Sequence, residues 1–147
     1  MYKRILVATD GSTLSKKAVR SAIGLAGAIG SELVVLYVVP RYPTAYFEGG
    51  VTISPQDVAH IEKQWADQGR AVVEAVKLAA QGEGIKAKAV TISSDLVAES
   101  IINAAKKQKC DLVVMASHGR KGIKRVLLGS ETQHVLTHSS VPVLVLR

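Results

Sequence analysis

The feature that most constrains the fold is a series of short, continuous apolar runs that alternate with segments of helical periodicity. Residues 5–8 and 33–39 are two such runs. Short apolar runs bounded by turn residues are typical of strands that are buried on both faces. Between them, apolar residues recur at helical spacing from Ala18 to Ala26, and Gly30 marks the helix end. A helix between two buried strands indicates a right-handed parallel crossover.

The same alternation continues to the end of the chain. We expect helices over residues 55–82, 96–107 and 130–139, and strands over residues 85–92, 111–116 and 141–146. Hydrophobic residues make up 48% of the 147 residues and aromatic residues only 4%, so the core is aliphatic. We therefore predict one domain over residues 1–147, a three-layer α/β sandwich with a five-stranded parallel sheet of the Rossmann-like kind.

Residues 40–54 interrupt the alternation with a long loop. Its prolines and glycines are accompanied by Tyr42, Tyr46 and Phe47. Long loops inside compact domains are often functional. A lid over a ligand, a partner surface and simple loop packing are equally consistent with this composition.

The most informative segment is residues 116–130, which follows a predicted strand and opens a predicted helix. It contains Gly119, Gly122 and Gly129, then Ser130 at the helix start, and four basic residues lie between the glycines. Glycines allow a close backbone approach, and the free N–H groups at a helix start attract anions. We predict a phosphate site, although a plain turn with a helix cap is the alternative. The Walker A and dinucleotide glycine patterns are both absent.

With these residues in view, the whole chain resembles the universal stress protein family. Residues 5–12 are similar to the family's first strand and acidic turn, and residues 141–145 to its last strand. The glycine segment resembles the ATP-binding subfamily's pattern Gly-x2-Gly-x9-Gly-Ser/Thr. Here Gly119 and Gly129 enclose nine residues and Ser130 follows, but Ala116 stands at the first glycine position. The resemblance implies an adenine nucleotide alpha hydrolase-like fold.

The resemblance also implies a binding site for ATP, accompanied by Mg²⁺. Asp10 would contact the nucleoside, Ala8 and Thr9 would line its pocket, and Val38 would meet the adenine. The glycine segment and the helix start would hold the ribose and phosphates through Ala116, Ser117, His118, Gly119, Arg120, Lys121, Gly122, Gly129, Ser130, Glu131 and Thr132. The implied function is nucleotide-dependent regulation in the stress response, by a homodimer paired through residues 141–146.

A different class of function is open as well: an interaction module of the same fold that binds no nucleotide. The methyl group of Ala116 would then crowd the phosphates and close the site. Enzymatic activity is expected to be slow ATP hydrolysis or autophosphorylation at most, because no nucleophile–base pair or paired carboxylates appear.

The remaining features narrow the class of protein. A single cysteine, Cys110, and the lack of a signal-peptide pattern at the N-terminus favour a cytoplasmic protein, and no apolar run is long enough to span a membrane. The formal net charge of +7 favours anionic partners, but the basic residues are spread along the chain without interleaved aromatics, which disfavours nucleic acid. His134 and His138 have metal-ligand spacing without a third ligand, so we expect surface histidines.

Overall fold

The computed structural model describes residues 1–43, 53–119 and 128–147, and within them the predicted alternation is confirmed. Arg120, Lys121 and Gly122 of the glycine segment, and Tyr46 and Phe47 of the long loop, lie outside the described residues. The elements in chain order are β1 (Arg4–Ala8), α1 (Thr13–Ile29), β2 (Glu32–Val39), α2 (Pro55–Gly82), β3 (Ala87–Ser93), α3 (Val97–Lys107), β4 (Leu112–Ala116), α4 (Ser130–His138) and β5 (Val143–Leu146).

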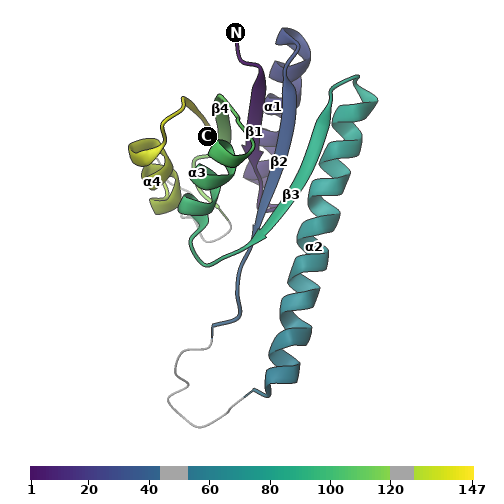
Figure 1. The fold of residues 1–147 in the computed structure, drawn as a ribbon, viewed down its shortest axis with the longest axis vertical. Coiled ribbons are helices and arrows are strands. Elements are labelled where there is room, and N and C mark those ends of the chain that lie inside the picture. Colours follow the sequence, from purple (N-terminus) through teal and green to yellow (C-terminus); the bar gives the residue numbers. More distant parts are fainter. Residues whose placement is uncertain (44–52, 120–127) are drawn as a thin grey trace.

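The strands form one parallel sheet in the order β3-β2-β1-β4-β5. This order, which the sequence pattern does not contain, places β1 at the centre and β3 and β5 at the edges. Helices cover both faces: α1 and α2 pack on one, and α3 and α4 on the other (Figure 1). The predicted three-layer sandwich with a five-stranded parallel sheet is therefore confirmed.

Alternation along the strands divides the core into two layers. In β1, Ile5 and Val7 join the core under α1 and α2, whereas Leu6 joins the core under α3 and α4. All three side chains are fully buried. Burial on both faces explains why β1 reads as an unbroken apolar run.

The helix ends follow from local capping chemistry. The Ser12 side chain accepts a hydrogen bond from the Ser15 N–H at the start of α1. At the end of that helix, Gly30 has φ of 73° and its N–H bonds to the Ala26 carbonyl. Pro55 occupies the first turn of α2, as predicted, beside a capping bond from the Asp57 N–H to Ser54.

Two strands, β3 and β5, begin two residues later than the sequence predicts. Ile85 precedes β3, yet it is buried in the core under α1 and α2. Residue Val141 precedes β5, because its N–H and carbonyl both bond to the Ser139 hydroxyl in a local turn. An apolar residue just before a strand can pack against the core without pairing with the neighbouring strand, so the apolar pattern predicts the strand start too early.

Candidate functional site

The strand order fixes where a ligand site is expected. The chain leaves β1 through α1 toward β2 on one side, and it reaches β4 on the other side through α3. The carboxyl ends of β1 and β4 therefore lie at a topological switch point, where connections diverge and leave a crevice. The predicted site residues follow these two strands.

The turn after β1 is held by its own polar side chains. Thr9 continues the strand ladder, since its N–H bonds to the Leu36 carbonyl at 2.9 Å. Its buried hydroxyl lies 3.0 Å from the Ser15 hydroxyl and accepts the Gly11 N–H at 3.2 Å. Thr9, assigned to a pocket wall from the sequence, is thus also a structural residue of this turn.

Asp10 sits at the apex of this turn. One carboxylate oxygen accepts the Ser12 N–H at 2.9 Å. The next residue, Gly11, has φ of 79°, a conformation that side-chain-bearing residues rarely adopt. The tight turn fixes the direction of the Asp10 carboxylate at the mouth of the switch point.

The glycine segment approaches the same carboxylate from β4. A Cβ placed on Gly119 would lie 2.9 Å from Asp10 Oδ2, so only a glycine fits without displacing the carboxylate. Residues that are 109 positions apart in sequence are thereby brought into contact. The structure places the acidic turn and the start of the glycine segment together.

The far end of the glycine segment is tied to β4 as well. The Gly129 N–H bonds to the Ser117 carbonyl at 2.8 Å, and the Ser117 N–H bonds to the Leu146 carbonyl at 2.7 Å. A Cβ on Gly129 would lie 3.3 Å from both the Ser117 oxygen and His118 Cα. Its φ of −64° is open to any residue, so close packing is what favours a glycine here.

Thr132 completes this anchor from the first turns of α4. Its hydroxyl lies 3.0 Å from the Ala116 carbonyl and 3.1 Å from the Ser117 carbonyl, and the residue is 2% exposed. The contacts hold the start of α4 against the end of β4. The N-cap residue Gly129 provides no side-chain hydrogen bond to the first turn of α4, which lies at this edge.

Glu131 has a different role from its neighbours. Its carboxylate accepts the Ala98 N–H at 2.8 Å and so caps the start of α3, where Leu96 provides no side-chain cap. The family resemblance assigned the backbone of residue 131 to the phosphate cradle, and its side chain is engaged with another helix. Only its backbone remains for that predicted role.

A row of half-buried apolar residues floors the carboxyl end on the α3–α4 face. Ala8 and Val38, both predicted site residues, pack against the core on this face. Val38 is paired in register with Ile92 of β3, which packs on the same side. Ile92 was not identified from the sequence, because the apolar pattern does not show that β3 lies beside β2.

Ala116 projects to the opposite face. It is 7% exposed and belongs to the core cluster under α1 and α2, together with Val114 and Ala18. Its methyl group is therefore directed away from the floor formed by Ala8 and Val38. The other predicted residues lie at this edge, with Ser117 buried, His118 half-buried and Ser130 exposed.

Outside this edge, the cysteine and the paired histidines show no sign of a reactive or metal-binding site among the described residues. Cys110 is buried, and burial raises the pKa of its thiol to about 11, which keeps it protonated and unreactive at neutral pH. The His134 and His138 rings lie 4.4 Å apart, but no group of three or more metal-ligating residues occurs in the described part of the chain. None of the described helices is long and apolar enough to cross a membrane.

Comparison with known proteins agrees with this architecture. The sequence matches the universal stress protein family over residues 1–147. It is 32% identical to the universal stress protein YxiE of Bacillus subtilis over 149 aligned positions, covering the whole of both chains.

Solved structures extend the similarity to three dimensions. UspA of Lactobacillus plantarum superposes with a TM-score of 0.83 at 25% identity, over 99% of this chain and 98% of that one. A universal stress protein solved in complex with cAMP shares the fold with a TM-score of 0.71 at 23% identity, over 99% and 97% of the two chains. Because the family match spans every residue, the chain belongs to the universal stress protein family.

Proposed function

We propose that this protein binds an adenine nucleotide at the carboxyl ends of β1 and β4 and serves as a nucleotide-dependent regulator in the stress response. The observation that carries the proposal is the meeting of Asp10 with Gly119 at the switch point, where the glycine leaves no side chain between backbone and carboxylate. A carboxylate at this position suits a ribose hydroxyl, as acidic residues do in other nucleotide-binding α/β sheets.

The phosphates would lie along the glycine segment toward α4. Gly129 presents bare backbone beside His118, and the uncapped first turn of α4 offers N–H donors together with the positive end of the helix dipole. The Ser130 hydroxyl is exposed there and adds a donor. Arg120 and Lys121 supply positive charge in the sequence between the two anchors.

The adenine ring would rest on the apolar floor. Ala8, Val38 and Ile92 are half-buried and lie on one face of three adjacent strands. An apolar, uncharged floor beside a carboxylate and a glycine loop suits a purine nucleoside better than a small inorganic anion. Solved proteins of this fold include one in complex with cAMP, which makes adenine nucleotides the first ligands to test.

The rival hypothesis of a module without nucleotide depended on Ala116 closing the site. The Ala116 methyl group packs into the core under α1 and α2, on the other side of the sheet from the apolar floor. Substitution of glycine by alanine at this position therefore leaves the proposed ligand space unchanged. This orientation favours nucleotide binding over the rival hypothesis.

Within the class of adenine nucleotides we propose ATP with Mg²⁺, on the family's Gly-x2-Gly-x9-Gly-Ser/Thr pattern. The described residues contain no group of three metal ligands, so a magnesium ion would be held mainly by the phosphate oxygens and water. Asp10 is the carboxylate nearest to that position in the proposed arrangement.

The test is calorimetric titration of nucleotide-stripped protein with ATP and Mg²⁺, for the parent chain and for Gly129→Asp. We expect saturable binding near one nucleotide per chain and a loss of more than about tenfold in the variant, since a carboxylate beside His118 would crowd and repel the phosphates. Gly24→Asp is the matched control, because a Cβ on Gly24 meets nothing within 4 Å. Equal affinity in Gly129→Asp and Gly24→Asp would contradict the proposed site.

We also propose that the protein is a cytoplasmic homodimer paired through β5. This strand forms one edge of the sheet, and its residue Leu144 is 41% exposed. An apolar, uncharged edge strand is prone to uncontrolled pairing unless a partner covers it. Light scattering should report twice the chain mass, and Leu144→Lys should shift the protein to monomer; a parent chain that is monomeric at micromolar concentration would contradict this.

A further inference from the structure

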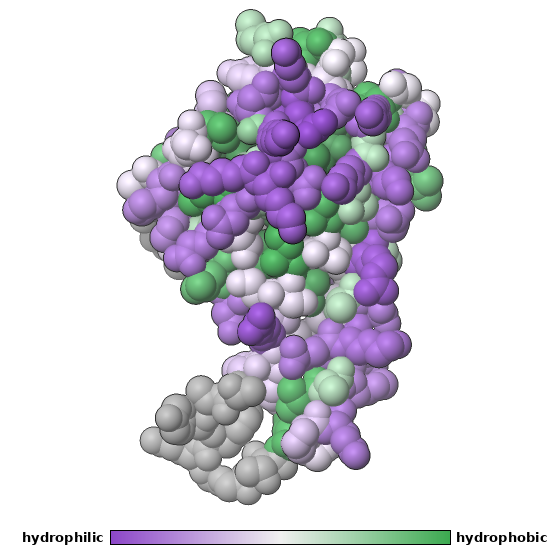
Figure 2. Space-filling view, in the orientation of Figure 1, coloured by the Kyte–Doolittle hydropathy of each residue, from purple (hydrophilic) through white to green (hydrophobic). Residues whose placement is uncertain are grey.

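The amino-terminal end of the sheet gathers positive charge from segments that are distant in sequence. Lys3 precedes β1, Lys88 lies near the start of β3, and the end of α3 and the turn after it add three more lysines. All of these side chains are exposed. We call this set the amino-end lysines: Lys3, Lys88, Lys106, Lys107 and Lys109. Figure 2 shows hydrophilic side chains covering the upper part of this face, over the strand starts seen in Figure 1.

Two acidic residues at this end, Glu32 and Asp111, are already engaged, and a third, Glu83, is exposed after α2. The Glu32 carboxylate lies 2.6 Å from the Arg4 guanidinium and 3.3 Å from the Lys86 ammonium. The Asp111 carboxylate accepts the backbone N–H groups of Lys3 and Arg4 at 2.9 and 3.0 Å. Among the described residues, none of the amino-end lysines forms an ion pair within 4.0 Å. Their charge is therefore directed to solvent.

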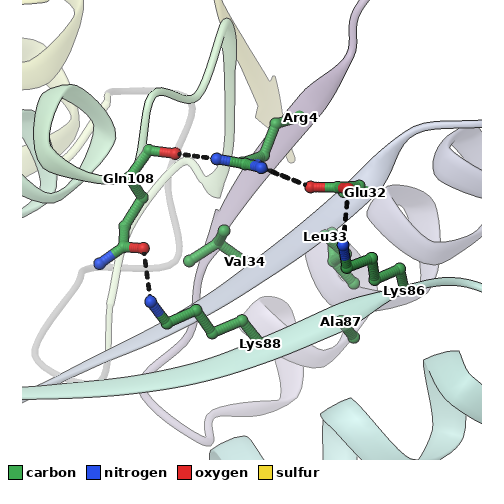
Figure 3. A pocket seen from close by; sticks show the side chains of 8 residues that line it. All are labelled: Arg4, Glu32, Leu33, Val34, Lys86, Ala87, Lys88 and Gln108. Carbon is green, nitrogen blue, oxygen red and sulfur yellow. Dashed lines mark hydrogen bonds and ion pairs between the residues drawn. The ribbon is translucent and has the colours of Figure 1, made fainter.

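Hydrogen bonds through Gln108 connect the segments on which these lysines lie. Arg4 donates to the Gln108 carbonyl at 2.7 Å, and Lys88 donates to the Gln108 side-chain oxygen at 3.0 Å. Gln108 thus joins the starts of β1 and β3 to the end of α3. Between them lies a hollow of about 170 Å³, floored by Leu33, Val34 and Ala87 and rimmed by the charged and polar side chains (Figure 3).

From this arrangement we infer that the amino-terminal end of the sheet binds the phosphate backbone of a nucleic acid, independently of base sequence. Lysines are flexible point charges that suit phosphates. The guanidinium of the neighbouring Arg4 is already bound to Glu32 and Gln108. Protein interfaces are depleted in lysine, so an acidic protein partner fits this surface less well. The surface lies at the opposite end of the strands from the proposed nucleotide site, so the two sites are separate.

The inference departs from the expectation drawn from the sequence, where spread charges disfavoured nucleic acid. Lys3 and Lys109 are 106 positions apart, and only the parallel sheet with its crossover helices brings strand starts and helix ends to one side. A charge that looks dispersed along the chain is concentrated by the topology.

The experiment measures the binding of a labelled single-stranded RNA and a labelled DNA duplex of mixed sequence by fluorescence anisotropy, from about 50 to about 200 mM salt. The test variant is Lys106→Gln/Lys107→Gln/Lys109→Gln in the full chain. Each lost phosphate contact removes nearly one counterion from the salt dependence, so we expect roughly 100-fold weaker binding near 0.1 M salt and a salt slope smaller by about two to three.

The matched control is Arg20→Gln/Lys63→Gln/Lys77→Gln, which removes the same charge from α1 and α2. It should retain most of the affinity, and circular dichroism should confirm that both variants are folded. Equal weakening in the two variants, or no saturable binding of either probe by the parent chain, would overturn the inference. Binding to vesicles containing phosphatidylserine without binding to either nucleic acid would overturn it too. ATP titration of the same variants separates this result from the nucleotide proposal.

Discussion

The two ends of the parallel sheet are built by different physical means. At the carboxyl end, backbone groups and small side chains make short, buried contacts, such as those of the Thr132 hydroxyl and the Gly129 N–H with the end of β4. At the amino end, long side chains form partly exposed ion pairs, led by that of Arg4 with Glu32. Buried contacts fix geometry and contribute to stability, whereas exposed pairs contribute little and mainly shape the field outside the protein.

Among the variants at the two ends of the sheet, Thr132→Val at the carboxyl end should lose the most stability. Thr132→Val keeps the shape but leaves the Ala116 and Ser117 carbonyls without this donor, at a position that is 2% exposed. We expect a loss of about 2 kcal/mol in the free energy of unfolding, measured by urea denaturation.

Thr137→Val is the control on the same helix. The Thr137 hydroxyl is exposed and bonds to the Gln133 carbonyl within α4. Loss of this hydroxyl should lower the free energy of unfolding by only a few tenths of the amount expected for Thr132→Val. Equal losses in both variants would contradict the claim that the buried contacts of Thr132 with β4 contribute more to stability than an exposed hydrogen bond does.

An intermediate effect is expected at Glu131, whose carboxylate caps α3 from α4. Glu131→Ala removes this cap, and the expected loss is about 1 kcal/mol, typical of a helix cap. Glu99→Ala provides the comparison, because Glu99 lies in the first turn of α3 and makes no capping bond among the described residues. Thermal unfolding of the two variants would distinguish them, and an unchanged midpoint for Glu131→Ala would exclude the capping role.

The smallest effect belongs to the amino end and depends on pH. The hydrogen bond from Arg4, followed by that from Lys86, lowers the pKa of Glu32 below its ordinary value near 4.5. Because the folded-state pKa is depressed, the carboxylate stabilises the fold above the unfolded pKa, and this contribution is lost as the pH falls through the folded pKa. Glu32→Gln should therefore be slightly destabilised at neutral pH and equal to the parent chain in strong acid.

Salt and a second variant sharpen this test. High salt should reduce the difference at neutral pH, since the pair is partly exposed. Glu62→Gln on α2, where Glu62 lacks an ion pair among the described residues, should lose less stability at neutral pH than Glu32→Gln. A Glu32→Gln variant that loses as much stability as Thr132→Val would reverse the ranking of the two ends.

Much of the fold was predictable because burial on both faces leaves a plain record in the sequence. The apolar run in β1 and the cap residues Ser12 and Gly30 marked their elements directly. Strand order was not predictable, because neighbouring strands leave no pairwise signal in the pattern of apolar residues. For the same reason, the adjacency of Val38 and Ile92 became visible only in three dimensions.

The candidate site was predictable as a set of residues but not as a set of roles. The segment around Gly119 and the turn at Asp10 were identified separately, and the structure brings them together. The orientation of Ala116 matters only once the ligand-facing side of the sheet is known, and the use of the Glu131 carboxylate as a cap depends on the packing of α4 against α3. Alternation along β4 gives the face of Ala116 relative to Val114, but only the strand order and helix packing show which face carries the proposed site.

The most direct test of the central claim, that the carboxyl end holds the nucleotide, is to map ATP and Mg²⁺ on the protein by backbone amide NMR. We predict that the perturbed amides cluster at residues 9–12, 117–119 and 129–132, while those at the starts of β1 and β3 remain unchanged. Perturbations centred on the hollow lined by Arg4, Glu32 and Lys88 instead would contradict the account, because the nucleotide would then occupy the opposite end of the sheet.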